Sequence, residues 1–252
     1  MNKLALGTVQ FGLKYGIANQ TGQVKLEDAK KILQLAKDAN IDLVDTAMAY
    51  GDSEKIIGDA GIIDFRFISK LPPLPKDCSD IDTWVKEKIQ STLMHLGIRS
   101  LYGLLVHRSE NLLGNSGKRL INSLNKMKLN GLVKKIGISI YDPSECEKII
   151  GLTRIDIVQA PLNIIDRRLV ASGWLSRLHS EEIEIHTRSV FLQGLLLMPR
   201  NKIPKIFDRW SAVWDQWSLE LEKNNLSAAE VCLLYPLSLP EIDRIVVGVD
   251  NL

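Results

Sequence analysis

Short apolar runs alternate with longer amphipathic segments along the whole chain. The apolar runs are rich in Ile, Leu and Val, which is typical of buried β-strands. The run EIEIHT at residues 182–187 alternates apolar and polar positions with the period of two that a strand requires. The pattern predicts strands at residues 4–6, 41–45, 65–70, 101–107, 133–139, 155–160, 182–187 and 244–249.

The amphipathic segments between these runs have the spacing of helices. In residues 27–39, the apolar positions Ala29, Ile32, Leu33 and Ala36 fall on one helical face. A short helix at residues 53–58 has Asp52 or Ser53 as its expected cap. Helices are predicted at residues 27–39, 53–58, 82–96, 118–129, 143–151, 167–179, 208–223 and 228–237.

Eight strands that alternate with helices predict a single (β/α)8 TIM barrel over residues 1–252. A doubly wound sheet is the alternative, but no GxGxxG follows any predicted strand. The chain stops just past the eighth strand, so we expect a barrel that lacks its last helix. A truncated form, a natural short form and a form covered by another chain all stay open. An uncovered flank predicts lower stability or self-association.

Composition excludes several classes of protein. The 252 residues are 45% hydrophobic and 25% charged, and 32 Lys and Arg nearly balance 30 Asp and Glu, which points away from nucleic acids and membrane surfaces. No apolar run is long enough for a signal peptide or a membrane span. The scattered residues Cys78, Cys146 and Cys232 indicate reduced thiols in the cytoplasm, and the histidine spacing indicates no metal site.

Polar side chains stand where several apolar strands end. Asp45 closes one run, Lys70 and His107 close two others, and Tyr50 lies in the loop after Asp45. A tyrosine donates a proton near neutral pH only if a nearby cation stabilises its anion, and Lys70 held by Asp45 could supply that cation. Each residue alone has an ordinary structural explanation. Together, at the ends of successive strands, they predict one site at the C-terminal face of a barrel.

The segments DTAMAYGDSE, ISKLP and LLVHRS resemble those that carry the catalytic tetrad of the aldo-keto reductases, and the likeness runs from Leu4 to Asn251. Asp45, Tyr50, Lys70 and His107 match that tetrad residue by residue. The resemblance implies reduction of an aldehyde or ketone by NADPH, with NADH as the second choice. Tyr50 would donate the proton, Lys70 would stabilise the phenolate, Asp45 would anchor Lys70, and His107 would orient the carbonyl.

The same resemblance implies where the cofactor binds. Ser139 and Gln159 match positions that hold the carboxamide, although Ile140 replaces the asparagine that often follows this serine, with Asn163 as a nearby substitute. Arg188 stands where many relatives carry an aromatic ring against the nicotinamide, and it could stack there or pair with a phosphate. The expected cofactor contacts are Gly7, Thr8, Val9, Ser139, Gln159, Arg188, Ser189, Val190, Phe191, Gln193, Gly194 and Asn251.

The substrate is less constrained than the chemistry. Trp210, Trp214 and Trp217 lie on one face of a predicted helix, which favours core packing over a substrate wall. The opening GTVQFGLKYGIANQTG resembles a bacterial subgroup linked to surface-polysaccharide sugars, which suggests a small sugar-derived carbonyl as partner. In the family, residues beyond the end of this chain help hold the 2′-phosphate, so weak discrimination between NADPH and NADH is expected. A nucleotide-sensing barrel with little or no turnover is the alternative function.

Overall fold

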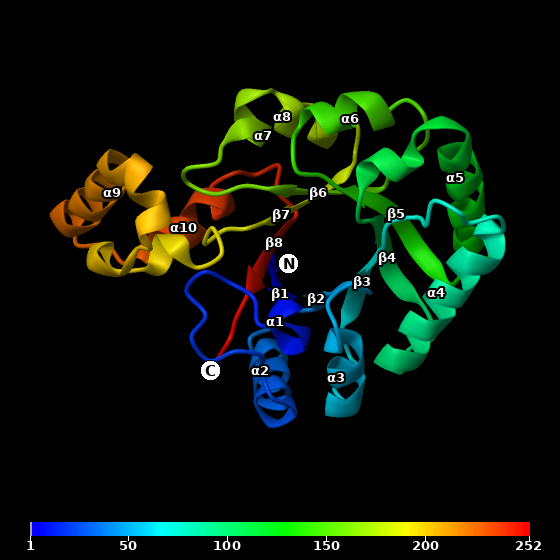
Figure 1. The fold of residues 1–252 in the computed structure, drawn as a ribbon, viewed down its shortest axis with the longest axis horizontal. Coiled ribbons are helices and arrows are strands. Elements are labelled where there is room, and N and C mark those ends of the chain that lie inside the picture. The colour runs from blue at the N-terminus through cyan, green and yellow to red at the C-terminus, as the bar shows by residue number, and fades with distance from the viewer. Residues whose placement is uncertain (1) are drawn as a thin grey trace.

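Eight parallel strands pair in sequence order, and β8 pairs with β1 to close a barrel, in the computed structural model, which describes residues 2–252 (Figure 1). The closed order confirms the predicted (β/α)8 barrel and excludes the doubly wound sheet. The strands are β1 (Leu4–Gly7), β2 (Leu43–Asp45), β3 (Arg66–Leu71), β4 (Leu101–Val106), β5 (Val133–Ser139), β6 (Ile157–Pro161), β7 (Glu184–Arg188) and β8 (Arg244–Gly248).

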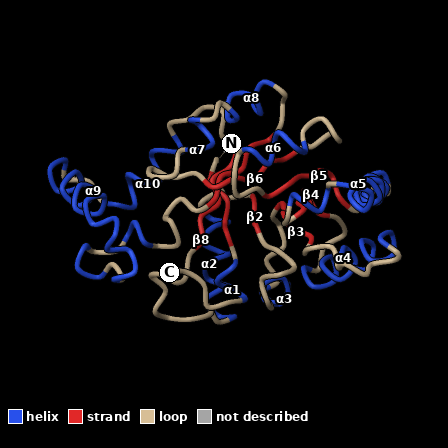
Figure 2. The backbone as a smooth tube through the Cα atoms, turned by 45° about the horizontal axis from the view of Figure 1, so that its top comes forward, coloured by secondary structure: helices blue, strands red, loops and turns tan. Residues whose placement is uncertain are grey.

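Helices surround the strands on the outside of the barrel (Figure 2). The α-helices are α1 (Val9–Gly12), α2 (Leu26–Asp38), α3 (Ser53–Ala60), α4 (Ile81–Leu96), α5 (Gly114–Leu129), α6 (Ser144–Ile149), α7 (Arg168–Ala171), α8 (Trp174–Ser180), α9 (Ser211–Asn224) and α10 (Ala228–Leu237). Short 3-10 turns are η1 (Ser109–Leu112), η2 (Leu195–Leu197), η3 (Arg200–Lys202) and η4 (Lys205–Trp210).

Several predicted boundaries were wrong, and backbone conformation explains two of them. The predicted helix 167–179 is two helices, because Gly173 has φ of 78° and ends the run between α7 and α8. Strand β7 begins at Glu184 rather than at residue 182, because Glu182 has φ of 57°, outside the range of a strand. Asp52 occupies the N-cap position of α3 without a side-chain cap bond. The one-turn helix α1 was not predicted.

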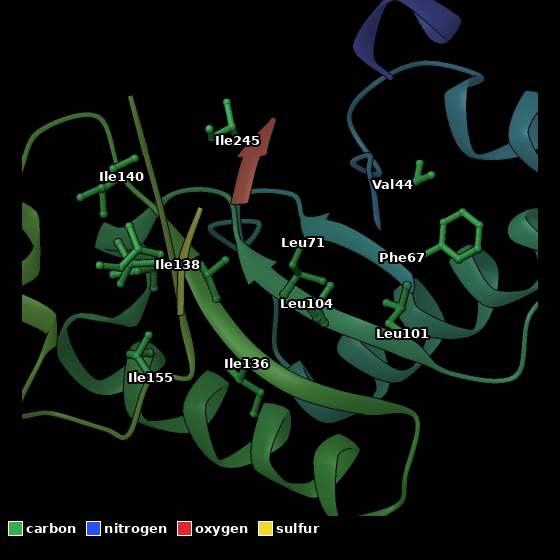
Figure 3. Close-up of a cluster of buried hydrophobic side chains, with 14 of the residues drawn as sticks. Val44, Phe67, Leu71, Leu101, Leu104, Ile136, Ile138, Ile140, Ile155 and Ile245 are labelled. Carbon is green, nitrogen blue, oxygen red and sulfur yellow. The ribbon is translucent and has the colours of Figure 1, made fainter. Parts of the chain in front are cut away.

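The main core lies between the strands and the helices around them (Figure 3). Outward-facing side chains such as Val44, Phe67 and Leu104 pack against helical residues such as Ile89 and Leu33, all buried. A second, smaller cluster fills the inside of the barrel. It consists of Ala5, Leu43, Ile68, Leu105, Ile157 and Val246. Both faces of the strands are therefore buried, as a parallel sheet requires.

The inward-facing positions form layers along the barrel axis. Because side chains alternate with a period of two, the residues two places after the inner apolar cluster also point inward, at the C-terminal end. These include Gly7, Asp45, Lys70, His107 and Gln159. The positions two places before that cluster include Arg66 and Arg244, at the N-terminal end. The interior is thus polar at both ends and apolar in the middle.

A long segment between β7 and β8 holds η2, η3, η4, α9 and α10, and α9 lies at the edge of the molecule (Figure 1). Its tryptophans pack within this segment. The indole N–H of Trp214 donates to the carbonyl of Phe207 at 3.1 Å, and that of Trp217 donates to Leu196 at 3.1 Å. Trp214 is buried, as predicted for a packing stripe, whereas Trp210 is 40% exposed. Within residues 2–252, β8 is the last regular element.

Candidate active site

The four candidate catalytic residues converge at the C-terminal ends of the strands. Asp45 ends β2, Lys70 lies in β3, His107 follows β4, and Tyr50 lies in the loop between β2 and α3. A cavity of ≈ 560 Å³ opens at this end, and Asp45, Tyr50 and His107 line it. Lys70 has no exposed surface, so it acts on the cavity only through its neighbours.

The carboxylate of Asp45 bonds to a side chain on the neighbouring strand β3 and to one on β6, across the barrel. Lys70 Nζ donates to Asp45 Oδ1 at 2.6 Å, and Gln159 Nε2 donates to Asp45 Oδ2 at 2.7 Å. Lys70 Nζ also donates to the carbonyl oxygen of Thr46 at 2.9 Å. The buried ammonium and the buried carboxylate therefore neutralise each other and have hydrogen-bond partners, which is what makes a charged pair tolerable in a protein interior.

The electrostatics keep Lys70 positively charged. Burial alone would lower the pKa of its ammonium, but the negative charge of Asp45 and then Tyr50 outweigh this effect and raise the pKa above its usual value. Lys70 Nζ lies 5.0 Å from the centroid of the Tyr50 ring. A fixed cation thus stands beside the phenol that faces the cavity.

His107 is the second polar group that faces Tyr50. The two rings are arranged edge to face with their centroids 6.0 Å apart. Burial, followed by the positive charge of Lys70, lowers the pKa of His107 to about 4, against an opposing effect of Asp45. The imidazole is therefore neutral near pH 7, and it can donate one hydrogen bond from its single N–H.

The loop that carries Tyr50 is held in place by the loop after β1. Ser53 Oγ donates to the carbonyl oxygen of Thr8 at 2.8 Å, and it lies 3.1 Å from Thr46 Oγ1. A Cβ atom added at Gly12 would lie only 1.6 Å from the carbonyl oxygen of Tyr50. The two loops therefore touch through backbone atoms, and the position of the Tyr50 backbone depends on the absence of a side chain at position 12.

The cavity brings together nearly all the residues that the resemblance assigned to the cofactor. Eleven of these line it, whereas Gln159 lies buried behind Asp45. The eleven are Gly7, Thr8, Val9, Ser139, Arg188, Ser189, Val190, Phe191, Gln193, Gly194 and Asn251. Tyr15 and Tyr141 also line the cavity but were not among the expected contacts. Their only signal was their place in the loops that follow α1 and β5.

Gln159 offers a direct test of whether a nicotinamide fits. An ionised carboxylate only accepts hydrogen bonds, so the amide nitrogen of Gln159 must face Asp45 and its Oε1 must face away. Gln159 Oε1 is buried and has no hydrogen-bond partner within residues 2–252. A buried acceptor without a donor is costly. The carboxamide N–H of a nicotinamide would satisfy it, with Ser139 paired beside Gln159 in register.

The loop after β7 has a strained backbone and contacts the loop after β1. Ser189, Leu192 and Gln193 have φ of 64°, 48° and 58°, values unusual for residues other than glycine. Ile17 N–H donates to the carbonyl oxygen of Gln193 at 2.8 Å, and a Cβ atom at Gly194 would lie 2.6 Å from Ala18 Cβ. The strained loop therefore depends on this contact for its shape, as loops at functional sites often do.

Two positions concern the asparagine that is missing after Ser139. Ile140 is fully buried, so it offers the cavity no side-chain amide. Asn163 does not line the cavity but donates to the carbonyl oxygen of Ser189 at 3.1 Å and accepts from the backbone N–H of Asp166 at 2.8 Å. Asn163 therefore holds the β7 loop and does not replace the missing asparagine.

A profile of the aldo/keto reductase family matches residues 3–252. The chain belongs to the aldo-keto reductase family. In this family member, the four residues matched to the tetrad on sequence meet at one end of the closed barrel.

Individual relatives are distant in sequence, and the solved structures among them are similar in fold. The oxidoreductase sirO from Leptosphaeria maculans is 24% identical over 218 residues, and the match covers 82% of this chain and 65% of that protein. The glycerol dehydrogenase from Gluconobacter oxydans is 18% identical, with a TM-score of 0.75 over 100% of this chain and 83% of that one. The holo form of an aldo-keto reductase from Bacillus halodurans is 18% identical, with a TM-score of 0.76 over 99% of this chain and 82% of that one.

Proposed function

We propose that this protein is an oxidoreductase that reduces the aldehyde or ketone group of a small molecule to an alcohol, with NADPH as cofactor and NADH as its substitute. In this reaction a carbonyl, a reduced cofactor and one proton give an alcohol and the oxidised cofactor. When bound, the reduced nicotinamide supplies the hydride. A sugar-derived carbonyl is the first class of substrate to test, since the opening of the chain resembles that subgroup.

Tyr50 would donate the proton to the carbonyl oxygen as negative charge develops there. Lys70, held charged by Asp45, would stabilise the phenolate that remains. His107, neutral at pH 7, would donate a hydrogen bond to the same oxygen and orient the carbonyl. Gln159 and Ser139 would bind the carboxamide, and the loop at residues 189–194 would lie along the pyrophosphate.

One observation carries this proposal most strongly: Lys70 has no exposed surface, bonds to Asp45 at 2.6 Å, and lies 5.0 Å from the ring of Tyr50. A buried lysine that serves only stability is costly to maintain. A fixed cation against a phenol in a cavity has an evident use in proton transfer.

No helix within residues 2–252 is both long and apolar enough to span a membrane.

Substitution of Tyr50 tests the proposal. Cofactor binding is followed by NADPH fluorescence, and turnover is followed with 4-nitrobenzaldehyde and a panel of sugar-derived carbonyls with NADPH and NADH. Tyr50→Phe should lower the rate by about a hundred- to ten-thousand-fold and leave the dissociation constant of NADPH nearly unchanged, because only the acidic proton is removed. Tyr102→Phe is a matched control, since Tyr102 lies at the N-terminal end of its strand.

Retention of more than about a tenth of the wild-type rate in Tyr50→Phe would contradict the role of Tyr50 as the acid. Tight NADPH binding by the wild type without turnover of any carbonyl would instead support a nucleotide-sensing barrel.

A further inference from the structure

Two guanidinium groups lie close to one aromatic ring at the rim of the cavity. The guanidinium carbon of Arg188 is 4.5 Å from the centroid of the Tyr141 ring, and that of Arg108 is 5.4 Å away. Tyr141 and Arg188 line the cavity, and Arg108 directly follows His107 in the chain. Stacking on an aromatic face holds a guanidinium in one orientation, so the rim carries an ordered positive charge.

These two arginines differ from several others in having no acidic partner. Arg168 pairs with Asp142 and Asp166, and Arg200 pairs with Asp215. Within residues 2–252, no carboxylate lies within ion-pair distance of Arg188 or Arg108.

The hydrogen bonds of Arg188 hold the guanidinium and leave donors free. Its Nη2 donates to the carbonyl oxygen of Ile140 at 2.9 Å, and its Nη1 donates weakly to Ser189 Oγ at 3.3 Å. Both acceptors are neutral, so the charge stays uncompensated. A guanidinium has further N–H donors, arranged to match the two oxygens of a carboxylate or phosphate. Arg188 is therefore positioned to bind an anion in the cavity.

The positive charge of the two arginines affects the titratable groups that would contact the carbonyl. After burial and the charge of Lys70, the charges of Arg188 and Arg108 also lower the pKa of His107. Burial raises the pKa of Tyr15, and the charge of Arg188 acts against that effect. Tyr15 and His107 line the same cavity as Tyr50. An anion at Arg188 would thus lie in the compartment where the carbonyl is held.

We propose that Arg188, assisted by Arg108, binds an anionic group of the substrate, a carboxylate or a phosphate, while Tyr50 and His107 face its carbonyl. This inference rests on the proposed function, because it assigns a class of substrate to that reaction. An anionic group on the substrate would neutralise the guanidinium of Arg188, whereas a neutral carbonyl compound would supply no counter-ion.

The competing role for Arg188 is the one expected from sequence, a contact with the cofactor. The two roles predict different measurements. A cofactor contact would raise the dissociation constant of NADPH when Arg188 is replaced, whatever the substrate. A substrate contact would leave that constant unchanged and would weaken only anionic substrates.

The experiment compares aldehydes that differ in charge at one position. The anionic pair is 4-carboxybenzaldehyde and 4-formylphenyl phosphate, which separates a carboxylate site from a phosphate site. The neutral pair is methyl 4-formylbenzoate and 4-nitrobenzaldehyde. Each is assayed for kcat and KM with the wild type, Arg188→Gln and Arg108→Gln. The control is Arg154→Gln, an exposed arginine in the loop between α6 and β6, at the opposite end of the barrel, which changes the net charge equally.

We expect Arg188→Gln to raise KM for at least one anionic aldehyde about tenfold or more, which is the usual effect of losing a hydrogen bond between charged groups. For the neutral aldehydes, any loss of kcat/KM should be about tenfold smaller than for that anionic aldehyde, and NADPH should bind as tightly as it does to the wild type. Arg108→Gln should show a smaller change of the same kind, since Arg108 is exposed, and Arg154→Gln should show none. Equal losses for neutral and anionic aldehydes, weaker NADPH binding, or no change in Arg188→Gln would overturn the proposal.

A binding measurement separates this inference from the proposed function. Isothermal titration of the four aldehydes into the protein with NADP⁺ needs no turnover, because the oxidised cofactor carries no hydride. If neither these aldehydes nor the sugar-derived carbonyls are reduced, the proposed function fails. Selective binding of an anionic aldehyde by the wild type, lost in Arg188→Gln, would still support the anion site. Binding that ignores the charge of the aldehyde would refute it.

Discussion

Asp45 accepts hydrogen bonds from two side chains at once, and the two donors lie in different parts of the site. Lys70 stands beside Tyr50, and Gln159 keeps a buried acceptor free. Asp45 thus fixes both the charge next to the phenol and the orientation of the Gln159 amide. We therefore expect a change at Gln159 to affect first the binding of the group that its free Oε1 faces.

We expect Gln159→Leu to raise the dissociation constant of NADPH severalfold, up to about tenfold, because one hydrogen bond to the carboxamide is lost. The carbonyl reduction rate should also fall, since Asp45 loses a donor. NADPH fluorescence titration measures the first effect. Gln34→Leu is the control, because Gln34 bonds only to Asp38 on the exposed side of α2. An unchanged dissociation constant in Gln159→Leu would show that the carboxamide binds elsewhere.

The lowered pKa of His107 predicts how stability depends on pH. An imidazole with a pKa of about 4 in the folded state and about 6.5 when unfolded binds more protons in the unfolded chain. Its neutral form therefore stabilises the fold fully above pH 6.5, and this contribution is lost as the pH falls towards 4. Urea unfolding should show a larger loss of stability from pH 7 to pH 5 for the wild type than for His107→Gln. Equal losses would contradict a buried, neutral His107.

The apolar pattern itself located the residues that end strands, whereas the loop residues around the cofactor were named only through the family resemblance. Asp45, Lys70 and His107 could be placed because the end of an apolar run marks a position at the barrel rim. Tyr15 and Tyr141 could not, because a loop has no period that says which side chain turns inward. The free oxygen of Gln159 was also beyond sequence reasoning, since it depends on a bond between residues 114 positions apart.

The elements around the site are joined through their backbones as much as through their side chains. The one-turn helix α1 ends at Gly12, against the loop that leads into α3. The hydroxyl of Ser53 at the start of α3 bonds back to Thr8. A change in the packing of α1 should therefore move Tyr50 without touching its side chain.

Gly12→Ala should lower both the melting temperature and the rate of carbonyl reduction. The new Cβ would lie 1.6 Å from the Tyr50 carbonyl oxygen and 2.6 Å from the Ser53 backbone nitrogen, so the loop must shift. Gly61→Ala is the control. There φ is 73° and a Cβ meets nothing within 4 Å, so only backbone strain of about 1–2 kcal/mol is added. A Gly12→Ala protein with normal activity would show that the loop adapts freely.

The periodicity of apolar residues predicted the type of most elements, but single residues determine where an element begins or ends. The strand at residues 133–139 and the helix at residues 228–237 were predicted with the bounds of β5 and α10. The break at Gly173 and the late start of β7 after Glu182 come from left-handed backbone. For glycine this conformation is permitted and not compelled, and for Glu182 it accompanies the backbone bonds that end α8, from Glu182 N–H to His179 and from Ile183 N–H to Leu178. Neither could be read from periodicity.

In the whole molecule, an apolar layer separates the two polar ends of the barrel interior. At the N-terminal end of the barrel, Glu184 accepts a hydrogen bond from Tyr102 at 2.8 Å, pairs with Lys135, and lies 2.7 Å from His186 Nε2. Burial alone would raise the pKa of Glu184, but the bond to His186 and then those from Lys135 and Tyr102 lower it to about 2. Tyr102 and Glu184 stand at the N-terminal ends of β4 and β7, whereas the cavity opens at the other end of the strands, so we expect this cluster to contribute to stability.

Glu184→Gln should cost about 2 kcal/mol of folding free energy at pH 7, because Lys135 loses its anionic partner and His186 Nε2 loses its contact with a carboxylate in a partly shielded place. The folded pKa of Glu184 lies below its ordinary 4.5, so its contribution is present above that pH and lost as the pH falls towards 2. The difference between wild type and variant in urea unfolding should therefore shrink on acidification. NADPH affinity and carbonyl reduction should stay within about twofold of wild type, and a large loss of either would couple the two ends.

The hydrogen bond between Gln159 and Asp45 spans 114 residues, and the pairing of β1 with β8 spans nearly the whole chain. Contacts between such distant segments form late in folding, because the chain between them must first be ordered. A refolding intermediate with most of its strands and helices would still lack the aligned amide of Gln159. If Gln159 binds the nicotinamide as proposed, recovery of nucleotide affinity during refolding should follow the closing of the barrel, whereas circular dichroism should follow the formation of its helices and strands.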